Sequence, residues 1–127
     1  MSGAVRMIGA VRGQEKLDLL AAADVMVRTS SHEVFPEAYL ESLSVGTPVA
    51  ATPAGDTPDI AEQSRAVLLL PHGDPQGQAA LLGDLLDDSA RRRLMSEAAL
   101  DYASRFVWEA QKEKYWDVLR SAAEAGE

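Results

Sequence analysis

Four short apolar runs alternate with segments of helical periodicity in the first 73 residues. These runs occupy residues 5–8, 24–28, 48–52 and 66–70. Each run is short enough for a strand and is bounded by the Gly, Pro and polar residues that favour turns. Because strands that alternate with helices form parallel sheets, the pattern predicts an α/β fold. We expect a partial doubly wound, Rossmann-like parallel sheet of about four strands with flanking helices.

Helical patterns account for the rest of the chain. Between the expected strands, helices are predicted over residues 14–23, 36–45 and 58–62. After residue 73 the pattern is helical only, with predicted helices beginning at Pro75, over 89–104 and over 108–123. Asp74 and Ser89 are the expected caps of the first two. A length of 127 residues suits one domain, 1–127, in which 1–73 alternates strands and helices and 74–123 forms a helical C-terminal end.

Charge and composition exclude several classes of function. The net charge of −8 would repel nucleic acid or an anionic membrane surface, so neither is an expected partner. The sequence has no cysteine, which excludes disulfides and thiolate metal sites. No apolar run approaches the length of a membrane span, and the N-terminus lacks the apolar core of a signal peptide. We expect a cytoplasmic protein.

The segment SSHEVFPEAYLESLSVGTPVAAT, residues 30–52, carries the strongest functional signal. It places two carboxylates, Glu33 and Glu41, around the start of a predicted helix that is followed by a strand. Carboxylates accept hydrogen bonds from sugar hydroxyls, and a helix N-terminus offers free N–H groups to phosphates. The segment is therefore suited to binding a sugar nucleotide.

Several motifs, taken in order, resemble one enzyme family. LLAAADVMVRTSS resembles the strand that enters its donor site, EVFPEAYLES keeps two glutamates separated by seven residues, and GTPVAATPAGDTPDI resembles the strand and turn that follow. The chain resembles, from about residue 5 to 119, the C-terminal nucleotide-sugar domain of GT-B fold retaining glycosyltransferases of group 1, or family 4.

This resemblance implies roles for individual residues. Glu33 would contact hydroxyls of the transferred sugar, and Glu41 would bind the ribose. Amides of the helix start would face the sugar or the diphosphate, and Gly55 would allow a close approach of the backbone to the ligand. The residues assigned to the helix start are Phe35, Pro36, Glu37 and Ala38, and Arg12 and Gly13 fall where the family loop meets the base. The implied substrate is a nucleoside-diphosphate sugar, with no metal and no cofactor.

The sequence also departs from the family pattern. Val34 and Asp56 stand where glycine is common. The family's first two strands, with the Arg and Lys that hold the diphosphate, and its acceptor domain have no counterpart here. The four expected strands would be the third to sixth of a sheet of order 3-2-1-4-5-6, in which the first and second strands lie between the third and fourth. Without these two strands, segment 5–8 must pair directly with 24–28, pair with another chain or stay loose. We expect a truncated domain, with a homodimer as one way to cover the edge, and no turnover by this chain alone.

Simpler interpretations stay open for the same residues. Glu41 could belong to a solvated acidic helix face, Glu33 could favour the helix dipole, and Arg12 and Gly13 could form a turn. Trp108, Tyr115 and Trp116 are expected to pack in a core or against another domain. The alternative function is a non-catalytic nucleotide-binding or interaction module, and a phospho-receiver is a weaker alternative because the acidic cluster it needs after the first strand is lacking.

Overall fold

Three parallel strands form the sheet at the centre of the molecule. The computed structural model describes residues 4–34 and 36–125. The strands are β1 (Met26–Arg28), β2 (Val49–Ala51) and β3 (Val67–Leu69), in the order β1-β2-β3. In the register of the sheet, Val49 lies between Met26 and Val67. The predicted α/β class and parallel sheet are confirmed, with three strands in place of about four.

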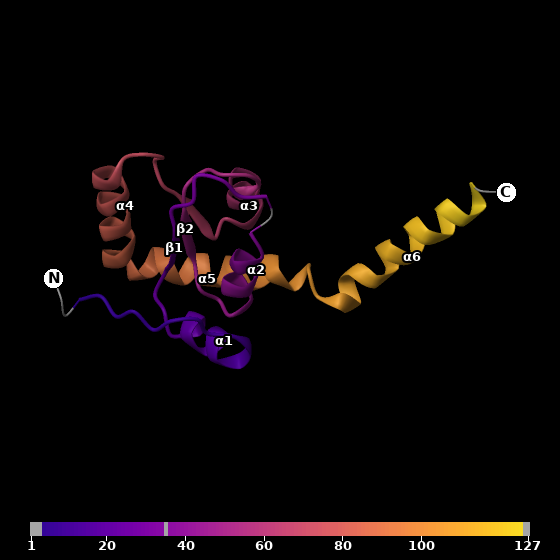
Figure 1. The fold of residues 1–127 in the computed structure, drawn as a ribbon, viewed down its shortest axis with the longest axis horizontal. Helices are drawn as coiled ribbons and strands as arrows, with labels where there is room; N and C mark the ends of the chain where they lie inside the picture. Colours follow the sequence, from indigo (N-terminus) through magenta and orange to yellow (C-terminus); the bar gives the residue numbers. More distant parts are fainter. Residues whose placement is uncertain (1–3, 35, 126–127) are drawn as a thin grey trace.

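The described ranges contain six helices, the last of which extends away from the sheet (Figure 1). They are α1 (Gly13–Ala21), α2 (Glu37–Ser44), α3 (Thr57–Ser64), α4 (Pro75–Asp87), α5 (Ser89–Ser104) and α6 (Trp108–Glu124). Asp74 caps α4 as predicted, because its Oδ1 accepts from the Gly77 N–H at 2.9 Å. The predicted cap of α5 was wrong by one residue: Asp88, not Ser89, accepts from the Arg91 N–H at 2.8 Å.

The main core lies between one face of the sheet and helices α2, α3 and α5. Val49 and Val67 face it from the sheet, Leu43 from α2, Ile60 from α3 and Tyr102 from α5. All three residues of β2 are fully buried, since neighbours cover this strand on both sides. Burial of a valine, leucine or isoleucine side chain of this core contributes roughly 1.5–3 kcal/mol to the free energy of unfolding. The core therefore fixes the central strand, whose carboxyl end leads to the candidate site.

The predicted strand over residues 5–8 was wrong. This segment forms neither strand nor helix, and its side chains are exposed, with Met7 91% accessible. Its strand propensity is not sufficient, because a strand needs a neighbour with which to exchange hydrogen bonds. β1 pairs only with β2, so its other edge is unpaired in the described chain. The homodimer expected from this edge stays a prediction.

Helix α6 projects away from the other elements (Figure 1). None of its residues is buried, and its large side chains, among them Trp108, Tyr115 and Trp116, are more than half exposed. Of the two expected environments for these aromatic residues, a core is wrong, and packing against another domain stays a prediction. Trp108 and Tyr115 contact each other, with ring centroids 6.1 Å apart. The helix therefore presents an apolar face without a partner in the described structure.

This exposure predicts that tryptophan fluorescence will not report on unfolding of the domain. Both tryptophans of the chain, Trp108 and Trp116, lie on α6, so their fluorescence should resemble that of tryptophan in water and change little when the domain unfolds. Emission spectra recorded along a urea titration, with far-UV circular dichroism as the reference, check this. A blue-shifted emission that moves to the red together with the dichroism transition would contradict the exposed position of α6.

In the ranges that the structure describes, no helix combines the length and the apolar character that crossing a bilayer requires.

Candidate functional site

The loop after β1 is held at the carboxyl ends of two neighbouring strands. Thr52, which follows β2, donates its N–H to the Arg28 carbonyl at 3.1 Å. Its hydroxyl donates to the Ser30 carbonyl at 2.5 Å. Thr52 is buried, with 2% of its surface exposed. In open α/β sheets, ligands bind outside the carboxyl ends of the strands, so this loop lies where a ligand site is expected.

Glu33 is the most deeply placed carboxylate of this loop. Its side chain is only 10% exposed, and its Oε1 lies in ion-pair contact with Nε of Arg28. The Arg28 Nε–H, however, donates to Ser30 Oγ at 3.1 Å, and Glu33 Oε1 has no aligned hydrogen-bond donor among the described residues. The charge of the carboxylate is thus balanced by Arg28, and Oε1 is covered by protein atoms.

Gly55 packs directly against the backbone of the Glu33 loop. A Cβ atom on Gly55 would lie 2.3 Å from the Glu33 carbonyl oxygen and 2.8 Å from that of Val34. Gly55 also has φ +53°, a conformation that glycine adopts without strain. Asp56 donates its N–H to the Val34 carbonyl at 3.4 Å. Glycine at position 55 therefore allows the loop that carries Glu33 to pack closely, whereas the sequence suggested that it allows close approach of a ligand.

The start of α2 offers two backbone amides. The helix begins at Glu37, and Pro36 is its N-cap, one position before the first helical turn in which we expected it. Proline has no N–H, so Pro36 cannot serve as a donor, and Tyr39 donates its N–H to the Pro36 carbonyl at 2.8 Å. Phe35 lies outside the described residues. The amides of Glu37 and Ala38 are left to face an anion.

Glu41 lies one turn after Glu37 on α2 and pairs with a residue that the sequence did not indicate. Its Oε1 is 2.5 Å from Nζ of Lys16 on α1. Both side chains are about one-third exposed, at 36% and 37%. Glu41 is therefore neither a fully solvated surface acid nor an unpaired one. Lys16 holds it in place and leaves its second oxygen available.

The proposed base-contact residues lie at the start of the same helix. Arg12 is the N-cap of α1, and Gly13 is its first residue with φ +56°. Both are exposed, and they form the loop-to-helix turn that we considered as the simpler interpretation. Lys16, which pairs with Glu41, follows them one turn later on α1. Their role toward a base stays a prediction.

The sequence did not predict three of these residues as part of the site: Lys16, Arg28 and Thr52. Lys16 is 25 residues before Glu41, and no local pattern reports a contact across that separation. A cation at a strand end, five residues before an acid, could have suggested the pair of Arg28 with Glu33. His32 bonds to Ser31 Oγ at 3.0 Å on the exposed surface of the loop.

Comparison with known proteins identifies the family. The sequence matches the family model for "Glycosyl transferases group 1" over residues 1–88, which is more than half of the chain. The chain belongs to this family. The resemblance inferred from the motifs around Glu33 and Glu41 is therefore confirmed for the family.

The curated relatives that this chain matches are considerably longer than the chain itself. A D-inositol 3-phosphate glycosyltransferase of Corynebacterium urealyticum is 35% identical over 121 residues, which cover 95% of this chain and 28% of the relative. The sulfoquinovosyl transferase SQD2 of Arabidopsis thaliana is 31% identical over 118 residues, 91% of this chain and 23% of the relative. The chain thus spans less than a third of the length of these relatives.

Solved structures show the same architecture. A sucrose-phosphate synthase from Thermosynechococcus elongatus superposes with a TM-score of 0.85 at 26% identity, over 97% of this chain and 31% of that one. Anabaena HepE, solved in complex with UDP, superposes with a TM-score of 0.74 at 27% identity, over 81% of this chain and 29% of the other. The GT-B relationship of the fold is confirmed by these superpositions.

Proposed function

We propose that this chain forms the donor side of a glycosyltransferase site and binds a nucleoside-diphosphate sugar for retaining transfer to an acceptor. The position of Glu33 carries this proposal, because Thr52 holds its loop at the carboxyl ends of β1 and β2, where ligands bind in open α/β sheets. A sugar hydroxyl that donates to the carboxylate of Glu33 would form a charge-assisted hydrogen bond. The solved HepE complex supports UDP as the first nucleotide to test.

Each group of the site has a chemical role in this proposal. Glu33 accepts from hydroxyls of the transferred sugar, and Glu41 accepts from the ribose. The amides of Glu37 and Ala38, at the positive end of the α2 dipole, face the diphosphate and favour its departure as an anion. Arg28 and Lys16 balance the two carboxylates, so an anionic donor meets a site with little net charge. Gly55 acts indirectly by holding the Glu33 loop.

A non-catalytic binding module is the second candidate. Pro36 favours it, because a helix start with a proline N-cap offers one amide fewer to a diphosphate. In that case the chain binds a nucleotide weakly and performs no transfer. No turnover is expected of this chain alone in either case, so relative affinity separates the two candidates. A donor site should bind UDP-glucose more tightly than UDP, because hydroxyls of the sugar donate to Glu33, whereas a nucleotide-binding module should bind both equally.

Removal of the Glu41 charge tests the binding proposal. Glu41→Gln should weaken UDP binding about tenfold, because a hydrogen bond to a charged group contributes roughly 1.5 kcal/mol or more. An NMR titration of the ¹⁵N-labelled chain with UDP measures the affinity, and the amides around Glu33 and Glu41 should shift. The same loss should follow when 2′-deoxy-UDP replaces UDP with the unaltered chain, but not with Glu41→Gln.

Glu97→Gln is the matched control, since it removes one exposed carboxylate on α5 away from the site. It should leave the affinity for UDP unchanged. The proposal fails if millimolar UDP shifts no amide near the two glutamates, or if Glu41→Gln and Glu97→Gln bind UDP equally well.

A further inference from the structure

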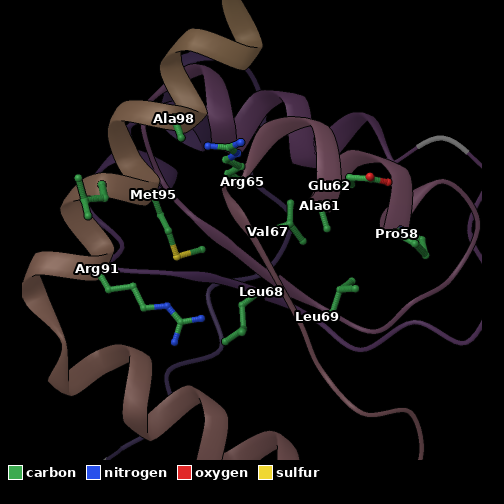
Figure 2. A pocket seen from close by; sticks show the side chains of 11 residues that line it. Pro58, Ala61, Glu62, Arg65, Val67, Leu68, Leu69, Arg91, Met95 and Ala98 are labelled. Carbon is green, nitrogen blue, oxygen red and sulfur yellow. The ribbon is translucent and has the colours of Figure 1, made fainter.

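A hollow lies along the outer edge of β3, on the side of the sheet opposite to β1. It has a volume of about 820 Å³ and is bordered by α3, β3 and α5 (Figure 2). All three residues of β3, Val67, Leu68 and Leu69, line it. Side chains of consecutive strand residues point to opposite faces of a sheet. Because all three nevertheless border one hollow, the hollow follows the edge of the strand.

This edge has backbone groups available for pairing. The Ala66 carbonyl accepts from the Val49 N–H at 3.0 Å, and the Leu70 N–H donates to the Ala51 carbonyl at 2.8 Å. In a parallel ladder, alternate residues turn toward the same neighbour, so Val67 and Leu69 direct their N–H and carbonyl groups away from β2. An edge of this kind is a template for an additional strand.

The rim of the hollow is basic. Arg65 and Arg91 line it, and neither guanidinium makes an ion pair or a hydrogen bond to another residue in the described part of the chain. Arg65 is held there in an unusual conformation: it ends α3 with φ 56°, at a position where glycine is usual. It is the single non-glycine residue with positive φ in ranges 4–34 and 36–125.

The floor of the hollow is apolar, and its one acid points elsewhere. Met95 and Ala98 of α5 line the hollow together with the arginines, and Leu69 on the strand is 40% exposed. Glu62 of α3 also lines the hollow, but its carboxylate is directed away from Arg91 in Figure 2. The surface therefore combines a free strand edge, apolar contacts for alternate side chains and two cations without partners.

We propose that the outer edge of β3 binds an extended acidic segment of a partner protein, which adds a fourth strand beside Val67–Leu69. Backbone hydrogen bonds to Val67 and Leu69 provide the pairing, apolar side chains of the segment fill the floor, and its carboxylates pair with Arg65 and Arg91. The extended segment 5–8 of a second copy of this chain is a poor occupant, because it carries the cation Arg6 and no acid. Charge thus argues against segment 5–8 of a second copy as the occupant.

A pair of short peptides tests this proposal. Both are about five residues long, the usual length of a strand, and alternate valine with either glutamate or lysine. In an NMR titration, the glutamate peptide should shift the amides of Val67 and Leu69, and its affinity should fall as salt is added. The lysine peptide should cause no such shift. Equal binding of both peptides, or shifts confined to other parts of the chain, would overturn the proposal.

Charge reversal on α5 provides the matched comparison. Arg91→Glu should weaken binding of the glutamate peptide about tenfold and allow the lysine peptide to bind. Arg93→Glu makes the same charge change on the same helix, but Arg93 does not line the hollow, so it should change neither affinity. If the two variants behave alike, the arginine is not a specific contact and the proposal is wrong.

Leu69→Pro tests the backbone pairing separately. The Leu69 N–H faces outward, so its loss leaves the hydrogen bonds between β2 and β3 intact while it removes a donor from the free edge. Binding of the glutamate peptide should be lost with no loss of parallel pairing in the sheet. A folded variant that still binds the peptide at full affinity would exclude strand addition. If the variant does not fold, the comparison of Arg91→Glu with Arg93→Glu decides.

Discussion

Replacing Gly55 with alanine is expected to destabilise the protein by about 3 kcal/mol and to abolish detectable UDP binding. The added Cβ would lie 2.3 Å from the Glu33 carbonyl oxygen, a separation that non-bonded atoms do not tolerate. The loop has to move, and the movement displaces Glu33. A left-handed backbone conformation adds about 1 kcal/mol for alanine. Urea unfolding of the variant measures the stability loss, and a UDP titration measures the functional one.

Gly73→Ala separates the two contributions to this effect. Gly73 has φ +72°, so alanine suffers similar backbone strain there, but its Cβ would meet no atom within 4 Å. We expect this control to lose only about 1 kcal/mol and to bind UDP normally. If Gly55→Ala is no less stable than Gly73→Ala, the contact between Gly55 and the Glu33 backbone is not important.

Replacing Arg28 with methionine is expected to destabilise the protein by about 2 kcal/mol. The variant leaves the carboxylate of Glu33, whose side chain is 10% exposed, without its counter-charge. Breaking a fully buried pair usually costs roughly 3–5 kcal/mol, and we expect less here because Arg28 is 37% exposed to water, which screens the interaction. Chemical unfolding at neutral pH measures the loss.

A double-mutant cycle assigns this loss to the pair. In the Arg28→Met background, Glu33→Gln removes the isolated charge and should restore at least half of the lost stability. Arg93→Met, on the exposed surface of α5, is the matched control and should cost less than about 0.5 kcal/mol. Additive effects of Arg28→Met and Glu33→Gln would show that the two side chains do not interact in solution.

Much of the fold could be predicted because its signals are local. The runs PVAAT and AVLLL contain β2 and β3, each one residue shorter at both ends, and DVMVR contains β1, which begins two residues later than the run. Asp74 followed by Pro75 marks the start of α4 because both residues have direct chemical reasons to begin a helix. Segment 5–8 fails as a prediction since its strand character depends on a neighbour that the described chain does not provide.

The sequence predicted two carboxylates of the candidate site but not which contacts they make. Family resemblance selects Glu33 and Glu41, and the confirmed family membership supports that choice without testing the roles of the two residues. The sequence does not reveal that Arg28 and Lys16 already contact these carboxylates, because tertiary contacts decide which charges meet. Nor does it reveal that Gly55 faces the Glu33 backbone, which only the position of a hypothetical Cβ shows.

The burial of β2 has a consequence for internal motion. Its three residues have no exposed surface and hydrogen-bonded neighbours on both sides, so this strand cannot open without separating the sheet. Helices α1 and α6, which have no buried residues, can fluctuate locally at much lower cost. Thr52 follows β2 directly and pins the loop that leads to Glu33. The acid that the donor sugar would meet is thus tethered to the part of the molecule that opens last, while Lys16 approaches Glu41 from one of the parts that open first.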